Sequence, residues 1–417
     1  MLDAITIHGY RSIESAIVDF GQVNLLVGEH GSGKSNLLDC LNLLYHIGQS
    51  NCQGYVNHIL KDNNALYSWF SHVDEEEGEV PQVSMTCHFR KNQYHVTLGP
   101  QAPYNVVFHD ESAGFVNDKS DYKVAFEGQN HLETRLTEEN LYTVAPFIRR
   151  AFESFQVYHF AEALDPQRIA SRSDLDDNKQ LRPDAGNIAA VLYRIKQHYP
   201  SRYHLIDELF RQTEPGFNCF DLEPDKEYTR LIECRWRHRH TLDSYKMSHL
   251  GIGTRRFLCL LVLLLQPTPP SVILIDEVEL GLTPKAQQII GGLIRNLGEE
   301  HQVIVTTASP TFIDQFEPQH LILCESVDGR SQYTALAEIR TDWSEARQIH
   351  TTGQLWQNNW FSLAATAPTN QPVAGGTMVF PSSFLHTNPT GGDRPFDKII
   401  DQILLDDGDG QEQTTEA

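Results

Sequence analysis

Eight consecutive residues near the N-terminus have the types and spacing of a phosphate-binding loop. They fit the pattern G-x-x-x-x-G-K-[ST]. Glycines let such a loop curl so that successive N–H groups face phosphate oxygens, and the following helix adds its positive end. Lys34 is then placed to reach the β- and γ-phosphates, and the Ser35 hydroxyl to ligate Mg²⁺. We therefore predict that ATP binds with Mg²⁺ at Gly28, Glu29, His30, Gly31, Ser32, Gly33, Lys34, Ser35 and Asn36.

The surroundings of residues 28–35 support this interpretation. Val23–Val27 is a largely apolar run that ends at Gly28, as expected of a buried parallel strand. A helix is predicted over residues 33–45, where Leu37, Leu41 and Leu44 form an apolar stripe at helical spacing. A strand, a glycine-rich loop and an amphipathic helix in this order favour a phosphate site over a glycine turn that binds nothing.

A pair of carboxylates follows a second apolar strand much later in the chain. Residues 272–277 read Val-Ile-Leu-Ile-Asp-Glu. Ligands of open α/β sheets bind at the carboxyl ends of the strands, so Asp276 is predicted to hold the Mg²⁺ through water. Glu277 is predicted to be the catalytic residue, which orients and deprotonates the attacking water. Glu279 stays open between a structural salt bridge and a role in the site.

The elements expected around these residues form an α/β sheet. Residues 271–275, 302–306 and 320–324 read as buried strands, and Ile252–Leu265 and Pro284–Leu297 as helices. Strands that alternate with helices argue for a parallel sheet.

A second, antiparallel sheet is expected earlier in the chain. Apolar and polar residues alternate over residues 82–90, which indicates a strand with one solvent-exposed face. Residues 94–98 and 105–108 are expected to join this strand in the sheet. Residues 111–140 are polar and weakly patterned, which predicts loop and helix. The composition after residue 363 predicts a disordered tail with a short helix near residues 396–405. Asp407 and Asp409 favour an acidic tail over a cation-binding loop.

Composition argues against several classes of protein. The seven cysteines include no C-x-x-C pair, so neither a disulfide framework nor a zinc site is indicated. The N-terminus has no signal-peptide pattern and the longest apolar run is too short to span a bilayer, which predicts a cytoplasmic protein without membrane contact. The net charge of −22 argues against nucleic acid as a partner but leaves it open. Residues 234–240 (CRWRHRH) favour a half-exposed strand over a nucleic-acid strip.

Six ordered blocks of residues carry a resemblance to a known family. They are residues 7–13 (IHGYRSI), 23–36 (VNLLVGEHGSGKSN), 173–193 (SDLDDNKQLRPDAGNIAAVLY), 250–258 (LGIGTRRFL), 272–284 (VILIDEVELGLTP) and 304–315 (IVTTASPTFIDQ). Over most of its length, up to about residue 362, the chain resembles the ABC-type ATPases of the RecF, SMC and AAA-like "overcoming lysogenization defect" group. It is most similar to the small bacterial members that have a head domain and no long coiled coil.

This resemblance implies an α/β fold, that of a P-loop NTPase with an ABC-type head. Such a head has a mostly parallel core sheet, an antiparallel subsheet and a helical signature lobe. The head would span residues 1–363, with the phosphate-loop lobe at about 1–160, the helical lobe at about 161–260 and the second half of the core sheet at about 268–340. Residues 364–417 would form the tail.

The resemblance also implies an oligomer. Two heads of this kind dimerise with ATP between one head's phosphate loop and the other's signature, so a homodimer or higher homo-oligomer is expected. Residues 250–254, called here the signature segment, would place Gly251, Gly253 and Thr254 against the ATP of the second head. Arg11 would approach the phosphates.

Several positions depart from the family's pattern. Gly251 stands where serine is usual, Ile252 where an acidic or small residue is common, and Ala308 where a His or Gln senses the γ-phosphate. Val278 and Thr283 replace the usual Pro and His. Because loss of one transition-state hydrogen bond can cost about 10²-fold in rate, we expect ATP to bind normally but to turn over slowly or only with a partner.

Three functions remain open at this point. The first is a slow ATPase switch that passes a conformational change to a partner. The second is a non-hydrolysing regulatory or scaffold protein for an effector nuclease or toxin, as in some anti-phage systems. The third is DNA repair or maintenance. The sequence contains no H-E-x-x-H or G-x-S-x-G pattern that would favour another enzyme class.

Overall fold

Two six-stranded sheets organise the protein. The computed structural model describes residues 1–59, 66–67, 81–101, 104–116, 122–137, 144–160, 172–241, 243–339 and 349–361. The core sheet has the strand order β17-β16-β3-β15-β14-β8, and all its neighbours are parallel except β16 and β17. Its strands are β3 (Val23–Val27), β8 (Val157–Tyr158), β14 (Val272–Ile275), β15 (Gln302–Thr307), β16 (Leu321–Val327) and β17 (Arg330–Ala335).

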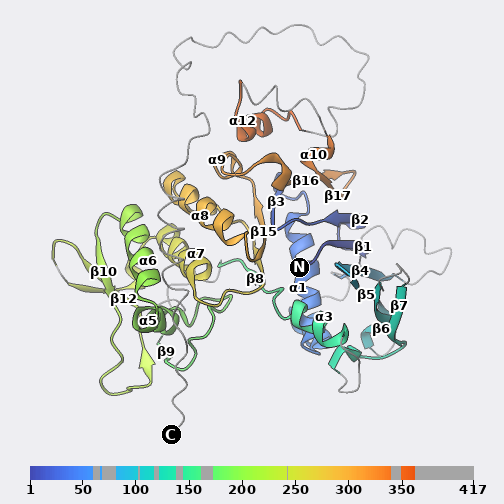
Figure 1. Cartoon of the computed structure of the whole chain (residues 1–417), viewed down its shortest axis with the longest axis horizontal. Helices are drawn as coiled ribbons and strands as arrows, with labels where there is room; N and C mark the ends of the chain where they lie inside the picture. The colour runs from blue at the N-terminus through green and yellow to red at the C-terminus, as the bar shows by residue number, and fades with distance from the viewer. Residues whose placement is uncertain are drawn as a thin grey trace.

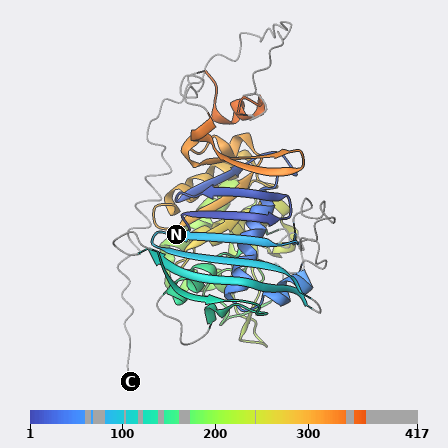
Figure 2. The same ribbon diagram turned by 90° about the vertical axis from the view of Figure 1, so that its right-hand side faces the viewer.

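The second sheet is antiparallel throughout and has the order β2-β1-β4-β5-β6-β7. Figure 2 shows this sheet face on, with its strands running across the view. Its strands are β1 (Ala4–Tyr10), β2 (Ile13–Asp19), β4 (Val83–Phe89), β5 (Asn92–Gln101), β6 (Tyr104–Val116) and β7 (Tyr122–Gly128).

The core sheet is buried on both faces, and each face has its own hydrophobic cluster. In β3, Leu25 packs with the helices of one side, whereas Leu26 packs against the antiparallel sheet on the other. All residues of β3, β14 and β15 are buried, as a parallel sheet between two layers requires. Figure 1 shows α1 between the two sheets, and α7 and α8 on the opposite side of the core sheet.

Helices and small sheets complete the fold. The α-helices are α1 (Lys34–Gly48), α2 (Cys52–Gly54), α3 (Val144–Phe152), α5 (Ile188–His198), α6 (Pro200–Thr213), α7 (Ile252–Leu265), α8 (Pro284–Leu297), α9 (Pro310–Ile313), α10 (Leu336–Ile339) and α12 (Thr352–Gln357). Strands β10 (Phe217–Asp221), β12 (Arg235–His238) and β13 (Ser244–Lys246) form a small antiparallel sheet, and β9 (Ser173–Asp174) pairs with β11 (Leu231–Ile232). Shorter helical turns are η1 (Tyr55–Ile59), η3 (Arg135–Thr137), η5 (Met247–His249) and η6 (Pro318–His320).

Most of the expected elements are confirmed, but the expectation of loop and helix for residues 111–140 was wrong at residues 111–116 and 122–128. The strand–loop–helix order at residues 23–48, both long helices after residue 250, and the strand within CRWRHRH are present. Residues 111–116 and 122–128 instead belong to β6 and β7. Strand β6 takes its register from β5, and β7 from β6, and a bulge between Ala113 and Gly114 interrupts the alternation that would have revealed a strand.

Some expectations fall outside the described residues. These are the tail at residues 364–417, its short helix and the acidic segment at Asp407 and Asp409. Among the described helices, none combines the length and the apolar character needed to cross a membrane.

Candidate active site

The loop after β3 needs glycine for two different reasons. Gly31 and Gly33 have positive φ angles of 79° and 98°, a conformation that costs side-chain-bearing residues free energy. At Gly28, a Cβ atom would lie 2.2 Å from the carbonyl oxygen of Cys324 on β16. The loop is therefore pressed against the neighbouring strand, and its curl depends on the absence of these side chains.

Lys34 lies inside this loop. Its Nζ donates hydrogen bonds to the carbonyl oxygens of Gly28 and Glu29 at 2.8 and 2.7 Å. Burial lowers its pKa, against the attraction of nearby acidic groups. The Ser32 hydroxyl is buried and has no hydrogen-bond partner among the described residues. An enclosed ammonium beside an unpartnered hydroxyl and a helix N-terminus fits a bound phosphate chain.

Ser35 and Asp276 come from distant segments and meet at the carboxyl edge of the core sheet. The Ser35 hydroxyl donates to Asp276 Oδ1 at 3.2 Å. The Thr306 hydroxyl, at the end of β15, donates to the same oxygen at 2.5 Å. A hydroxyl and a carboxylate are hard oxygen ligands, and Mg²⁺ usually takes only one or two such groups from the protein beside phosphate and water. This pair fits that donor set.

In the described part of the chain, no cluster of three or more His, Cys, Asp or Glu residues has the arrangement of an all-protein metal cage. A site completed by phosphate oxygens agrees better with the pair Ser35 and Asp276.

Glu277 follows directly and adopts a left-handed backbone with φ of 49°. Its N–H donates to the Thr306 hydroxyl at 2.7 Å. Two histidines flank its carboxylate: His30 Nδ1 lies 3.9 Å from Oε1, and His159 Nε2 lies 3.6 Å from Oε2. The acid is about one-third exposed, so a water molecule can approach it.

Reasoning from the sequence missed His159 and Thr306. His159 follows β8, whose Tyr158 pairs with Ile275 of β14, so the register sets His159 beside Asp276. Its Nε2 is 3.8 Å from Asp276 Oδ2. No local pattern marks β8, because it consists of only two residues. For Thr306, the signal was available, since it lies near the carboxyl end of a buried strand parallel to β14.

The signature segment lies at the start of α7, and none of its hydrogen bonds within the described residues reaches the phosphate loop. Gly251 occupies the N-cap position without a side-chain cap. The Thr254 hydroxyl donates to Glu214 Oε2 at 3.2 Å. At Gly253, a Cβ atom would lie 1.9 Å from the carbonyl oxygen of Gly281, so the two backbones are in direct contact.

The structure places Arg11 and Asn36 together at the flank of α1. Arg11, with φ of 49°, hydrogen-bonds Asn36 Oδ1 at 3.3 Å and forms an ion pair with Asp39. The Asn36 amide donates to the Ser12 hydroxyl at 2.5 Å. These contacts join the β1–β2 turn to the first turns of α1, so Arg11 supports the helix that follows the phosphate loop.

Ala308 and Glu279 contact each other. The Ala308 N–H donates to Glu279 Oε1 at 2.7 Å, while Glu279 Oε2 is buried and has no partner among the described residues. Ala308, the position after β15, therefore makes this contact through its backbone N–H. Glu279 forms no ion pair with a described residue.

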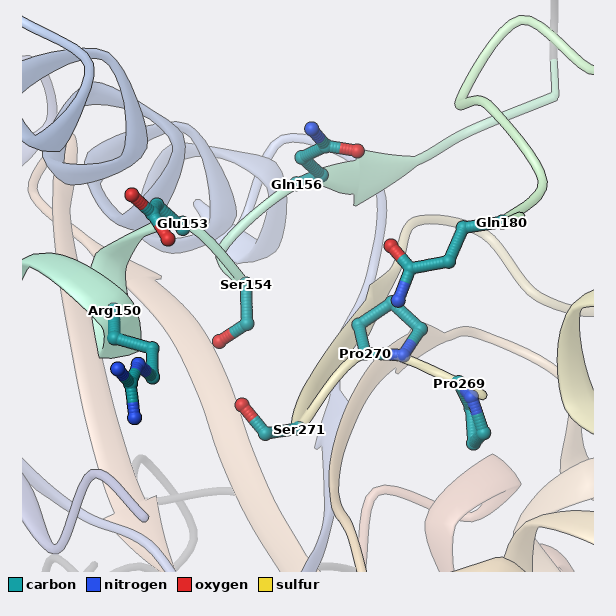
Figure 3. A pocket seen from close by; sticks show the side chains of 8 residues that line it. All are labelled: Arg150, Glu153, Ser154, Gln156, Gln180, Pro269, Pro270 and Ser271. Atoms are coloured by element: carbon teal, nitrogen blue, oxygen red, sulfur yellow. The ribbon is translucent and has the colours of Figure 1, made fainter. Parts of the chain in front are cut away.

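A separate pocket of about 240 Å³ lies away from this site. Figure 3 shows its lining side chains, among them Gln156 before β8 and Ser271 before β14. Both residues precede the strands, so the pocket opens at the amino ends, opposite Asp276.

With this geometry in place, a family model described as "AAA domain, putative AbiEii toxin, Type IV TA system" matches residues 23–314. The chain belongs to this AAA family. The match runs from the first residue of β3 beyond the end of α9, and so includes the phosphate loop, Asp276 and the signature segment. No curated protein matches the chain.

A solved structure of an SMC head shares the fold of this AAA protein. An SMC head bound to the C-terminal winged-helix domain of ScpA has a TM-score of 0.50 at 15% identity, over 80% of this chain and 96% of the other. An Smc head with an extended coiled coil, from a complex with the C-terminal domain of ScpA derived from Pyrococcus furiosus, scores 0.45 at 14% identity, with coverage of 83% and 99%. The Thermotoga maritima SMC head domain scores 0.38 at 14% identity, with coverage of 80% and 98%.

These findings define the protein at the level of its class. It is an ATP-binding P-loop protein of an AAA ATPase family, and it has the ABC-type head fold of an SMC head. The expected fold class is thereby confirmed.

Proposed function

We propose that this protein hydrolyses ATP slowly, in the presence of Mg²⁺, as a conformational switch. The observation that carries the proposal is the convergence of Ser35, Asp276 and Glu277 at one edge of the core sheet. Lys34 and the amides of the loop would hold the triphosphate, and Ser35 and Asp276 would hold the cation. When bound, Mg²⁺ would neutralise charge on the phosphates. Glu277 would orient the attacking water and accept its proton.

The slow rate follows from groups that the site lacks. Neither Gly251 nor Ala308 has a side chain that can hydrogen-bond a γ-phosphate. The remaining donors at these positions are backbone N–H groups, and that of Ala308 is already bonded to Glu279. Loss of one such transition-state hydrogen bond costs about 10²-fold in rate.

We further propose that residues 1–363 form one ATPase head, and that two heads associate with ATP between them. The start of α7 supports this arrangement, because Gly251 is exposed and the first N–H groups of a helix have no intrahelical partner, so they can bind a ligand held by another molecule. The biological output would be anti-phage defence or DNA repair. The family description, which names a putative toxin of a type IV toxin–antitoxin system, favours the first, and the net charge of −22 disfavours direct duplex binding.

The second candidate is a regulatory or scaffold protein that binds ATP without hydrolysing it and acts on an effector nuclease or toxin. The missing side chains at Gly251 and Ala308 favour it. One experiment separates the two candidates: ATP turnover and oligomeric mass are measured together, with and without DNA, for wild type, Lys34→Ala and Glu277→Gln.

The switch predicts slow Mg²⁺-dependent turnover in wild type, no ATP binding in Lys34→Ala, and an ATP-bound dimer that persists in Glu277→Gln. The scaffold predicts ATP binding with equal dimer lifetimes in wild type and Glu277→Gln. A wild-type rate of about 1–10³ s⁻¹, the ordinary enzyme range, would contradict the slow switch. Failure to bind ATP in magnesium buffer would contradict both.

A further inference from the structure

A completely buried arginine lies in α7, the helix that begins at the signature segment, and it contacts the candidate active site. Arg256 is in the second turn of α7 and its exposed fraction is 0%. The rest of the helix, residues 257–265, is apolar and buried. Burial of an ion in such surroundings costs several kcal/mol unless its hydrogen bonds are made. The contacts of this guanidinium should therefore show what it does.

Arg256 donates hydrogen bonds to the backbone of the two predicted site acids, Asp276 and Glu277. Its Nη2 donates to the carbonyl oxygen of Asp276 at 2.9 Å and to that of Glu277 at 2.5 Å. Such bonds from a charged donor are stronger than those between neutral groups. Arg256 forms no ion pair with either carboxylate within the described residues, so its direct contacts with these acids are to their backbone.

The backbone that Arg256 holds is in an unfavourable conformation. Glu277 has φ of 49°, and a left-handed residue with a side chain persists only where its surroundings impose it. Its N–H is bonded to Thr306 at 2.7 Å, and its carbonyl oxygen accepts bonds from Arg256 and from the N–H of Leu280. Arg256 is the charged one among these three, and it comes from a different element from Glu277.

The same helix presents its first turn to solvent. Gly251 is exposed, and Ile252 has an exposed fraction of 52%. Arg256 lies five positions after Gly251, which is about 7.5 Å along the helix axis. Gly253 lies against the backbone of Gly281, in the turn that follows Glu277 and Glu279. A molecule that docks on the first turn of α7 would therefore move a helix that contacts residues 276–281 at two points, through Gly253 and through Arg256.

We propose that Arg256 is a positioning residue that fixes the backbone of Glu277 and couples it to the exposed first turn of α7. Docking of a ligand or a second head at Gly251 and Ile252 shifts α7, and Arg256 carries this shift to the carbonyl groups of Asp276 and Glu277. The Glu277 carboxylate then aligns with the attacking water only when the first turn of α7 is occupied by the docked molecule.

Unused hydrogen-bonding capacity supports a second arrangement of Arg256. Its Nε and Nη1 have no hydrogen-bond partner among the described residues, and neither has the buried Oε2 of Glu279. Opposite charges with unmet hydrogen bonds in one buried region favour a small displacement that pairs them. The helix shift that the proposal requires would supply such a displacement.

Arg256→Met tests the proposal, since methionine keeps an unbranched apolar side chain in the buried site and removes the donors of the guanidinium. We expect kcat to fall about 10²-fold, with the Kd for a non-hydrolysable ATP analogue unchanged within about twofold. Arg256→Lys, which keeps one charged donor, should recover part of the rate. In a Glu277→Gln background, Arg256→Met should cause no further loss in single-turnover assays, because both changes act through one carboxylate. Lys285→Met, which removes an exposed cation from α8, is the matched control and should keep the wild-type rate.

This inference rests on the proposed role of Glu277 in hydrolysis, so one arm of the test does not depend on turnover. Crystal structures of wild type and of Arg256→Met or Arg256→Lys should show Glu277 leaving the left-handed region in the methionine variant, and a smaller change with lysine. Equal losses of ATP binding and kcat, an additive loss with Glu277→Gln, or an unchanged φ at Glu277 would overturn the proposal. If wild type shows no turnover, hydrolysis is excluded and the crystal structures alone decide the positioning role.

Discussion

Thr306 connects to both acidic residues of the candidate site at once: its hydroxyl donates to Asp276 Oδ1 and accepts the N–H of Glu277. A single hydroxyl on β15 thus fixes the side chain of one acid and the backbone of the next. Ser35 reaches the same Asp276 oxygen from the far end of the phosphate loop. The geometry of the site is therefore set by three neighbouring strand ends rather than by the loop alone.

The contact between Ser35 and Asp276 predicts a magnesium-specific effect of Asp276→Asn. The amide keeps the shape of the side chain and removes the charge that a cation requires. Affinity for ATP in Mg²⁺ should fall about tenfold or more, as expected for the loss of a charged interaction of 1.5–3 kcal/mol. Affinity in EDTA should stay the same or rise slightly. Titration calorimetry in both buffers measures the difference, and equal losses in both would contradict a metal role.

Gly251→Ser is predicted to be tolerated and to speed turnover. A Cβ atom at this position would meet nothing closer than the Thr254 hydroxyl at 3.8 Å, and its φ of −59° suits any residue. Serine at an N-cap stabilises a helix by a few tenths of a kcal/mol relative to glycine. It would also present a hydroxyl beside the exposed helix end. We expect a slightly higher Tm and a faster steady-state rate, with Gly251→Ala as the control that adds the carbon without the hydroxyl.

Gly253→Ala, two residues later, is predicted to behave in the opposite way. The added carbon would lie 1.9 Å from the backbone oxygen of Gly281, and neither backbone can move without shifting α7 or its neighbouring turn. Overpacking of this kind costs about 1–3 kcal/mol. The urea midpoint should drop clearly below that of Gly251→Ala. A midpoint equal to that of wild type would show that α7 is not held against Gly281 in solution.

His46 predicts a loss of stability in mild acid. It stacks on Tyr55 with ring centroids 4.4 Å apart, and burial lowers its pKa to about 4. In the unfolded chain its pKa is about 6.5, so protons bind the unfolded state more readily. Its contribution to stability is complete above about pH 6.5 and is lost as the pH falls toward 4.

His46→Phe should flatten this pH dependence, because phenylalanine keeps the stacked ring and cannot be protonated. Urea unfolding at several pH values between 7 and 5 measures the slope. Burial also lowers the pKa of His95 and of His320, so the variant should remove only part of the dependence. An unchanged slope would contradict the assignment to His46.

The local sequence determined the parts of this protein that depend on neighbouring residues. The glycines at 28, 31 and 33 permit the curled backbone of the loop, and the apolar runs Val23–Val27 and Val272–Ile275 read correctly as buried strands. Lys34, Ser35, Asp276 and Glu277 could be named in advance, because residue types at fixed offsets from a strand end carry the chemistry.

Tertiary structure alone decided which distant groups meet. The pairing of β8 with β14 sets His159 beside Asp276, and the packing of α7 brings Arg256 behind Glu277. Strand β6 likewise takes its register from β5, and β7 from β6, rather than from their own pattern. Contacts of this kind arise from sheet order and helix packing, which join segments as far apart in the sequence as His159 and Asp276 and leave no periodic signal in either one.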